Sequence, residues 1–173
     1  MTFSEYRLTS TQKGAVTEHL VASVLTLASD GRLSPFMPMS DDDGVDLLVL
    51  DKVTNAVLAI QVKSAIANAS RKTVQFDVRK ATLGVHANRY LLAVLFDPDS
   101  VAIALSWLIP MSDVPTVSVA QATKFALSPS TAATTADRYQ PDRNATPHAL
   151  AEAVLQVMTD CANPHEAVGT SRF

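Results

Sequence analysis

Four polar side chains stand at spacings that could build one reactive site. Glu18 and Asp46 are carboxylates, Gln61 follows Asp46 by fifteen residues, and Lys63 comes two residues later. Carboxylate and amide oxygens are hard ligands that suit Mg²⁺ or Mn²⁺, and an ammonium group beside them stabilises charge on a phosphate. Cores avoid burying such charges unless the charges pair or hold a metal. These residue types therefore favour metal-assisted hydrolysis.

The length and composition of the chain indicate which class of protein contains these residues and exclude others. With 173 residues, 47% of them hydrophobic and 18% charged, the chain fits one globular domain over residues 1–173. Five glycines, nine prolines and one cysteine exclude a collagen-like chain and a disulfide scaffold. The first fifteen residues carry Glu5, Arg7 and Lys13 instead of an apolar signal, so we expect a cytoplasmic protein.

The element that positions Glu18 is expected to be a helix. Start and stop signals predict it from about 11 to 29, with Ser10 or Thr11 as N-cap and Gly31 just past the end. At 3.6 residues per turn, Glu18 shares the stripe that should face the core. The apolar members of this stripe are Ala15, Val21, Ala22 and Leu25.

Two strands are expected to position the other three side chains. The runs over 45–50 and 56–63 are joined by a segment too short for a crossover helix, which predicts an antiparallel hairpin. If opposed residue numbers sum to about 107, Asp46 lies opposite Gln61. Gln61 and Lys63 share a sheet face, because side chains two apart in a strand point the same way. The hairpin should then present Asp46, Gln61 and Lys63 as one cluster.

The order of the remaining elements predicts an α+β (α/β) domain with a central mixed sheet. We expect a core over about 11–110 and a C-terminal extension over about 111–173. The further elements expected are a short strand over 33–39, an exposed strand over 73–78, a buried central strand over 89–96, its antiparallel neighbour over 101–109, a surface loop over 128–147 and a helix over 147–161.

At the four polar residues the chain resembles the PD-(D/E)XK, or restriction endonuclease-like, nuclease superfamily. The matching run is Glu18, then Gly44-Val45-Asp46, then Gln61-Val62-Lys63. The resemblance covers about 11–96 and departs from the commonest pattern at Gln61, where Glu or Asp is usual. A Gln-x-Lys variant is similar to that of type IV, modified-DNA restriction nucleases. The resemblance implies a central mixed sheet flanked by an N-terminal and a C-terminal helix.

The same resemblance implies a function and a role for each residue. The expected function is a metal-dependent endonuclease that hydrolyses phosphodiester bonds of DNA, with RNA less favoured. Asp46, the amide oxygen of Gln61 and the backbone carbonyl of Val62 would hold Mg²⁺ or Mn²⁺. Lys63 would assist the transition state, and Glu18 would hold a second metal, a bound water or Lys63 itself.

A nucleic-acid partner needs local positive charge, because the net charge of −3 supplies no global basic field. The segment from Lys63 to Arg89 is rich in cations and contains the single acid Asp77. Such cations would give salt-sensitive DNA binding. A homodimer is also expected, because one small domain with one site cuts one strand per binding event. The candidate DNA contacts are Arg71, Lys72, Arg79, Lys80 and Arg89.

Each of these residues also has a plain structural interpretation. Asp46 could be a solvated turn residue after the acidic loop at 41–43, and Lys63 could be an exposed lysine at a strand end. Glu18 could pair with Lys13 or reach solvent, and the cations could serve solubility. The alternative function is a catalytically disabled module that keeps the fold and binds nucleic acid or a protein. A third is a subunit of a defence or mobile-element system, recruited through the last helix.

Overall fold

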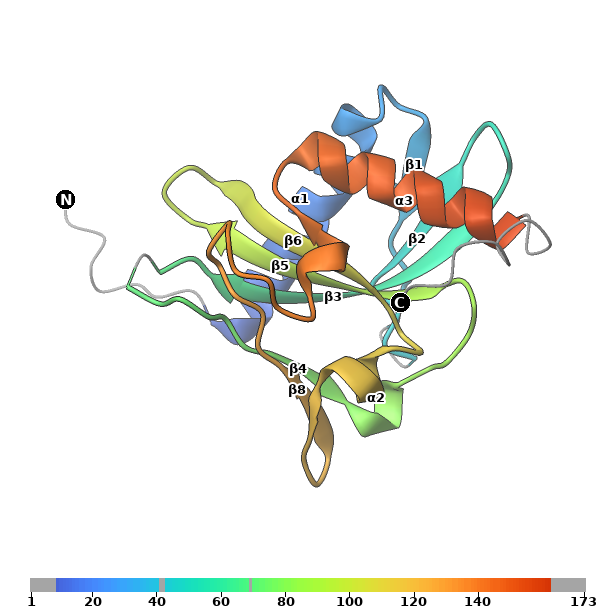
Figure 1. Ribbon diagram of the computed structural model, residues 1–173. Coiled ribbons are helices and arrows are strands. Elements are labelled where there is room, and N and C mark those ends of the chain that lie inside the picture. The colour runs from blue at the N-terminus through green and yellow to red at the C-terminus, as the bar shows by residue number, and fades with distance from the viewer. Residues whose placement is uncertain (1–8, 41–42, 69, 163–173) are drawn as a thin grey trace.

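The computed structural model describes residues 9–40, 43–68 and 70–162, which are built around a six-stranded sheet (Figure 1). β3 and β5 run parallel and the other neighbouring strands run antiparallel, so the predicted mixed sheet is confirmed. The strand order is β1 (Leu33–Phe36), β2 (Leu47–Asp51), β3 (Val57–Ile66), β5 (Arg89–Asp97), β6 (Ala102–Pro110) and β9 (Arg143–Asn144).

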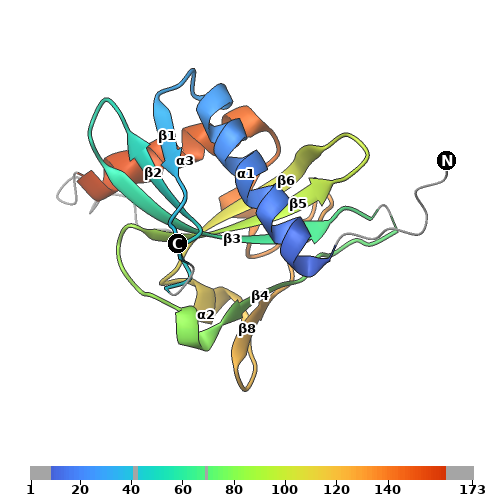
Figure 2. The same cartoon turned by 180° about the vertical axis from the view of Figure 1, so that it is seen from behind.

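Two helices cover one face of this sheet. Figures 1 and 2 show α1 (Ser10–Ala28) and α3 (Pro147–Ala162) on the same side of it. Val21 and Leu25 of α1 and Val154 of α3 are buried in one apolar cluster with Ile60 and Leu92 of the sheet. The helix–sheet–helix order of the chain therefore gives an α+β fold, as predicted. No helix in the described part of the chain is both long and apolar enough to cross a membrane.

The start of α1 differs from the prediction, and its end agrees. Thr9, not Ser10 or Thr11, is the N-cap: its hydroxyl accepts from the backbone of Gln12, whose side chain in turn accepts from the backbone of Thr9. This reciprocal capping box satisfies two helix N–H groups, an advantage that a later start would lose. Gly31, at φ +76°, donates its N–H to Thr26 and ends the helix.

A second, smaller sheet covers the opposite face of the large one. It consists of β4 (Phe76–Arg79), β8 (Lys124–Leu127) and β7 (Val119–Ala120), and the short helix α2 (Val114–Val117) packs beside it. The strand predicted over 73–78 is present as the shorter β4, but the prediction that it is exposed is wrong. Phe76 and Val78 are buried, and the Phe76 ring lies 5.9 Å from that of Trp107. β4 faces a core because β8, distant in sequence, pairs with it.

The segment over 128–147 is not the simple surface loop that its polar composition predicts. Tyr139 is buried in the second apolar cluster, and its hydroxyl donates to the carbonyl of Val117 at 2.6 Å. A 3-10 turn, Gln140–Asp142, then leads into β9, which pairs with β6 at Ser106 and Trp107. One aromatic anchor and two strand pairs thus hold the segment against the fold.

The hairpin of β2 and β3 has the predicted register. Leu47 pairs with Ile60 and Leu50 with Val57, so opposed numbers sum to 107. β3 nevertheless runs three residues beyond the predicted end, because β5 pairs with it as far as Ile66. β1 is shorter than expected, ending at Phe36. Among the described strands, β2 thus pairs only with the first half of β3, which leaves one edge of the second half open.

Candidate functional site

Asp46 lies just before β2, where its carboxylate is held by the backbone of β3. Its N–H donates to the carbonyl of Ile60 at 2.9 Å, although Ile60 already pairs with Leu47. Two residues therefore oppose one, which is the arrangement of a β-bulge. The Asp46 carboxylate accepts a hydrogen bond of 2.6 Å from the N–H of Val62. Asp46 is buried, so its interpretation as a solvated turn residue is wrong.

This bulge corrects the predicted pairing of Asp46 with Gln61. The register of 107 holds from Leu47 onward, but at Asp46 the backbone bond shifts to Ile60. The shift turns the Asp46 side chain toward the edge of β3. Since the N–H and C=O of a strand residue point to the same side, the carbonyl of Val62 faces that edge as well.

Gln61 is buried to 2% exposure, and its amide is closely confined. Gly44 lies against it at φ +64°, and a Cβ there would stand 2.6 Å from Gln61 Nε2 and 2.8 Å from Thr82 Cβ. Within the described residues, the amide oxygen of Gln61 is buried without a hydrogen-bond partner. A buried oxygen that no described protein group satisfies can accept a hydrogen bond from a water molecule or bind a metal ion, for which an amide oxygen is a suitable ligand.

Lys63 lies beside Gln61 in a pocket of about 450 Å³ between the two sheets. The predicted shared face of Gln61 and Lys63 is therefore confirmed. Lys63 is half-buried, which differs from an exposed strand-end lysine. Across the pocket, β4 supplies Asp77 and Arg79, and β8 supplies Lys124. Three cations and one carboxylate thus line a space next to an unsatisfied oxygen, which favours an anionic ligand.

Lys124 belongs to this pocket, and the sequence did not point to it. Its ammonium lies 2.6 Å from the carboxylate of Asp77, which also accepts from Gln75 at 3.0 Å. The hydrogen bond from Lys124 holds the pKa of Asp77 below its usual range. Lys124 reaches the pocket only through the pairing of β4 with β8, and no local pattern reveals a pairing between strands so far apart in sequence.

Glu18 lines a neighbouring pocket of about 170 Å³ together with Asp46 and Met37. It is half-buried at the edge of the α1 core face, whose centre is formed by Thr17, Val21 and Leu25, while Ala15 is exposed. The structure therefore places the four predicted side chains in two pockets, with Glu18 and Asp46 in one and Gln61 and Lys63 in the other. The two pockets adjoin along the chain, since Gly44 lines one and Val45 and Asp46 line the other.

The five predicted DNA-contact residues divide between different environments. Arg79 lines the pocket of Lys63, and the Lys80 ammonium stands 5.3 Å above the ring of Phe125. Arg71 and Lys72 are exposed after β3. Arg89 is half-buried and donates to the backbone carbonyl of Asp43, so its guanidinium is engaged within the fold. Of the acidic loop at 41–43, residues 41 and 42 lie outside the described residues.

The donor set for a metal ion is poor in carboxylates. Within the described residues, no group of three or more His, Cys, Asp or Glu side chains is placed to hold a metal. An ion at this site would rely on one carboxylate, Asp46, with the oxygens of Gln61 and Val62. Mg²⁺ is compatible with such a set, because it commonly keeps several waters and uses one or two carboxylates.

Comparison with solved structures relates the fold of this chain to a known one. A bacterial homing endonuclease, I-Ssp6803I, matches with a TM-score of 0.57 over 91% of this chain and 99% of that chain, at 16% sequence identity. The chain shares its fold with that homing endonuclease. The fold class predicted from the sequence is confirmed. No family model matches the sequence, and no curated protein matches it.

Proposed function

We propose that the chain is a metal-dependent endonuclease that hydrolyses phosphodiester bonds of DNA, with RNA less favoured, and that its site is a Gln-x-Lys variant of the PD-(D/E)XK type. The observation that carries this proposal is the buried amide oxygen of Gln61 beside Lys63, to which no described residue offers a hydrogen bond. The fold, which is that of a homing endonuclease, supports it. A natural core keeps an unsatisfied polar atom only at a cost, and a metal ligand role removes that cost.

Mg²⁺ or Mn²⁺ would be held by Asp46, the amide oxygen of Gln61 and the backbone carbonyl of Val62. A bound ion would supply Lewis-acid activation of the phosphate and of a water molecule. Asp46 is already oriented for this role, because the Val62 N–H holds one of its oxygens. A fixed carboxylate loses little freedom when it becomes a ligand.

Lys63 would act on the phosphate itself. Its ammonium lies in the pocket between the sheets, where Arg79 and Lys124 add positive charge. Donors placed beforehand in a half-buried site stabilise the developing phosphate charge more than mobile surface lysines would. Glu18, which shares a pocket with Asp46, would hold a second ion or a water molecule.

The first test is cleavage of a panel of plasmid, single-stranded DNA, branched DNA and RNA in Mn²⁺. Wild type should yield DNA products, and Lys63→Ala and Asp46→Asn should yield none while keeping their circular dichroism spectra. The matched control is Lys52→Ala, an exposed lysine in the turn at the other end of the same hairpin. Products from Lys63→Ala and Asp46→Asn at the wild-type rate would refute the assigned site.

A second candidate function is a disabled module that binds nucleic acid or a protein without cleaving. The observation that favours it is the neutral Gln61, which leaves Asp46 as the single carboxylate in the proposed ligand set. Calorimetry separates the two functions. The nuclease should release or absorb heat on titration with Mn²⁺, and Asp46→Asn should not; a disabled module should show no Mn²⁺ heat in either protein.

A further inference from the structure

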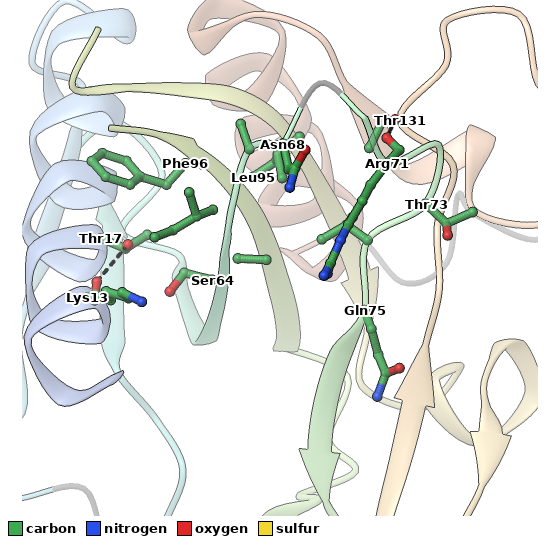
Figure 3. Close-up of a pocket in the computed structure, with 14 residues that line it drawn as sticks. Lys13, Thr17, Ser64, Asn68, Arg71, Thr73, Gln75, Leu95, Phe96 and Thr131 are labelled. Carbon is green, nitrogen blue, oxygen red and sulfur yellow. Dashed lines mark hydrogen bonds between the residues drawn. The ribbon is translucent and has the colours of Figure 1, made fainter. Parts of the chain in front are cut away.

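We propose that a recess beside the nuclease site binds one unpaired nucleotide of the DNA strand, next to the bond that is cleaved. Figure 3 shows this recess between α1 on one side and the start of β4 on the other, with Lys13 and Arg71 reaching toward it. The recess has a volume of about 670 Å³, which suits a ligand of nucleotide size. The inference rests on the proposed nuclease function and names how that substrate is held.

The floor of the recess is the open edge of β3. The N–H of Ala59 bonds to Asn88 and that of Ala67 to Phe96, so alternate residues of β3 face β5. The intervening residues, Val62, Ser64 and Ile66, therefore direct their backbone groups to the other edge. Over the described residues, β2 pairs with β3 only as far as Ile60. The N–H of Val62 on this edge donates to Asp46, whereas the backbone groups of Ser64 and Ile66 line the recess and can meet phosphate oxygens.

The walls carry positive charge and neutral hydrogen-bonding groups. Lys13 comes from α1 and Arg71 from the segment after β3, and no Asp or Glu is among the described residues that line the recess. An ammonium and a planar guanidinium are suited to one phosphate, which the guanidinium can bind with two parallel hydrogen bonds. Asn68 and Gln75 add amides, which can donate to and accept from a base edge.

The residues that line the recess are next to those of the Lys63 pocket along both β3 and β4. Ser64, in its floor, follows Lys63 in β3. On the opposite wall, Gln75 lines the recess and donates to Asp77, which lines the pocket of Lys63. A strand whose phosphate lies at Lys63 would therefore place its neighbouring nucleotide in the recess.

The recess is bounded by α1, by β3 and by the segment leading into β4, and its volume of about 670 Å³ suits one nucleotide. An occupant of this size is a single nucleotide that has left the double helix. A nucleotide reaches such a pocket from a flap, an overhang or a flipped position, at the cost of unstacking. A preference for DNA with an unpaired nucleotide follows from this geometry.

The test measures binding without cleavage, in the Lys63→Ala protein, by fluorescence anisotropy in EDTA. Two labelled probes are compared, a duplex with a short single-stranded flap and the same duplex with blunt ends. Arg71→Gln and Lys13→Gln should each weaken flap binding by about fivefold, and each should reduce the log–log salt slope by about 0.7. Blunt-duplex affinity should change less than about twofold. Lys52→Gln, which removes the same charge far from the recess, is the matched control.

Two results would overturn the inference. Unchanged flap affinity in both variants would show that the recess holds no phosphate. An equal loss for the flap and the blunt duplex would show that Lys13 and Arg71 contact a double helix. Because the readout is binding, the inference and the nuclease proposal fail independently: absent cleavage by wild type leaves this comparison intact.

Discussion

Among single residues, Gln61 is the one on which the proposed metal site most depends. An amide in place of a second carboxylate avoids like-charge repulsion with Asp46 and lowers the cost of burial. The same substitution removes one negative ligand, so the site should bind its metal ion more weakly than a two-carboxylate site. The amide oxygen of Gln61, which has no partner in the described part of the chain, is then a compromise between folding without the metal and binding it.

This compromise predicts the behaviour of Gln61→Glu. In EDTA, the added carboxylate should lower the melting temperature, because burying a charged group at a position that is 2% exposed costs more than burying a neutral amide. Mn²⁺ should then raise the melting temperature by more than it does in wild type, since binding to the native state alone stabilises it. Differential scanning fluorimetry with and without Mn²⁺ measures both effects. Equal Mn²⁺ shifts in the two proteins would contradict a ligand at position 61.

Among the helices and strands, the site depends on β2 being shorter than β3, so that the described segment before β2 is free of regular pairing. The bulge at Asp46 ends the pairing of β2 while β3 continues to Ile66. Gly44 then brings the backbone against the Gln61 amide. The open half of β3 is thus lined by a carboxylate at one end and by the nucleotide-sized recess at the other.

Alanine substitutions at two glycines with positive φ distinguish the cost of backbone strain from the loss of the site's geometry. Gly44 and Gly31 both have positive φ, but a Cβ at Gly44 would meet Gln61 Nε2 at 2.6 Å, and one at Gly31 would meet nothing within 4 Å. Each Gly→Ala change should cost about 1 kcal/mol or more of unfolding free energy from the backbone alone. Only Gly44→Ala should also lose cleavage, because it displaces the Gln61 amide.

Urea unfolding and cleavage rates measure the two effects on the same proteins. The Gly31→Ala variant is the control for a general loss of stability. Full cleavage by Gly44→Ala, or an equal loss of cleavage in both variants, would show that the fit of Gly44 against Gln61 has no functional role.

The sequence predicts the elements better than their contacts. Alternation and a short turn predict the register at Leu47 and Leu50, and an unbroken apolar run predicts the central strand β5. The bulge was not predictable, because it depends on a hydrogen bond from the backbone of Val62 to the side chain of Asp46. Lys124 was missed for a similar reason, since only the pairing of distant strands brings it to Lys63.

At the scale of the whole molecule, an ion pair ties the hairpin to the segment that enters β1. The guanidinium of Arg32 makes two hydrogen bonds, of 2.7 and 2.8 Å, to the buried carboxylate of Asp51. The same carboxylate accepts from the N–H of Val53 and the hydroxyl of Thr54 in the turn. The hydrogen bonds from Arg32 hold the pKa of Asp51 well below its usual range.

This lowered pKa predicts a pH dependence of stability. A carboxylate whose pKa is lower in the folded state stabilises the fold above its unfolded pKa, about 3.9, and loses that contribution as the pH falls through the folded value. Asp51→Asn should therefore lower the unfolding free energy by about 1–3 kcal/mol at pH 7. The difference from wild type should shrink below about pH 4. A difference that stays constant from pH 7 to pH 3 in urea titrations would contradict this role.

The proposed mechanism requires a metal ion and Lys63 to act together on DNA. Its most direct test is a time course of supercoiled plasmid with Mn²⁺, in which excess EDTA is added midway, run in parallel for wild type and Lys63→Ala. We expect nicked or linear product from wild type alone, with accumulation stopping when EDTA is added. Product from Lys63→Ala at the wild-type rate, or product that continues to accumulate in EDTA, would contradict the claim.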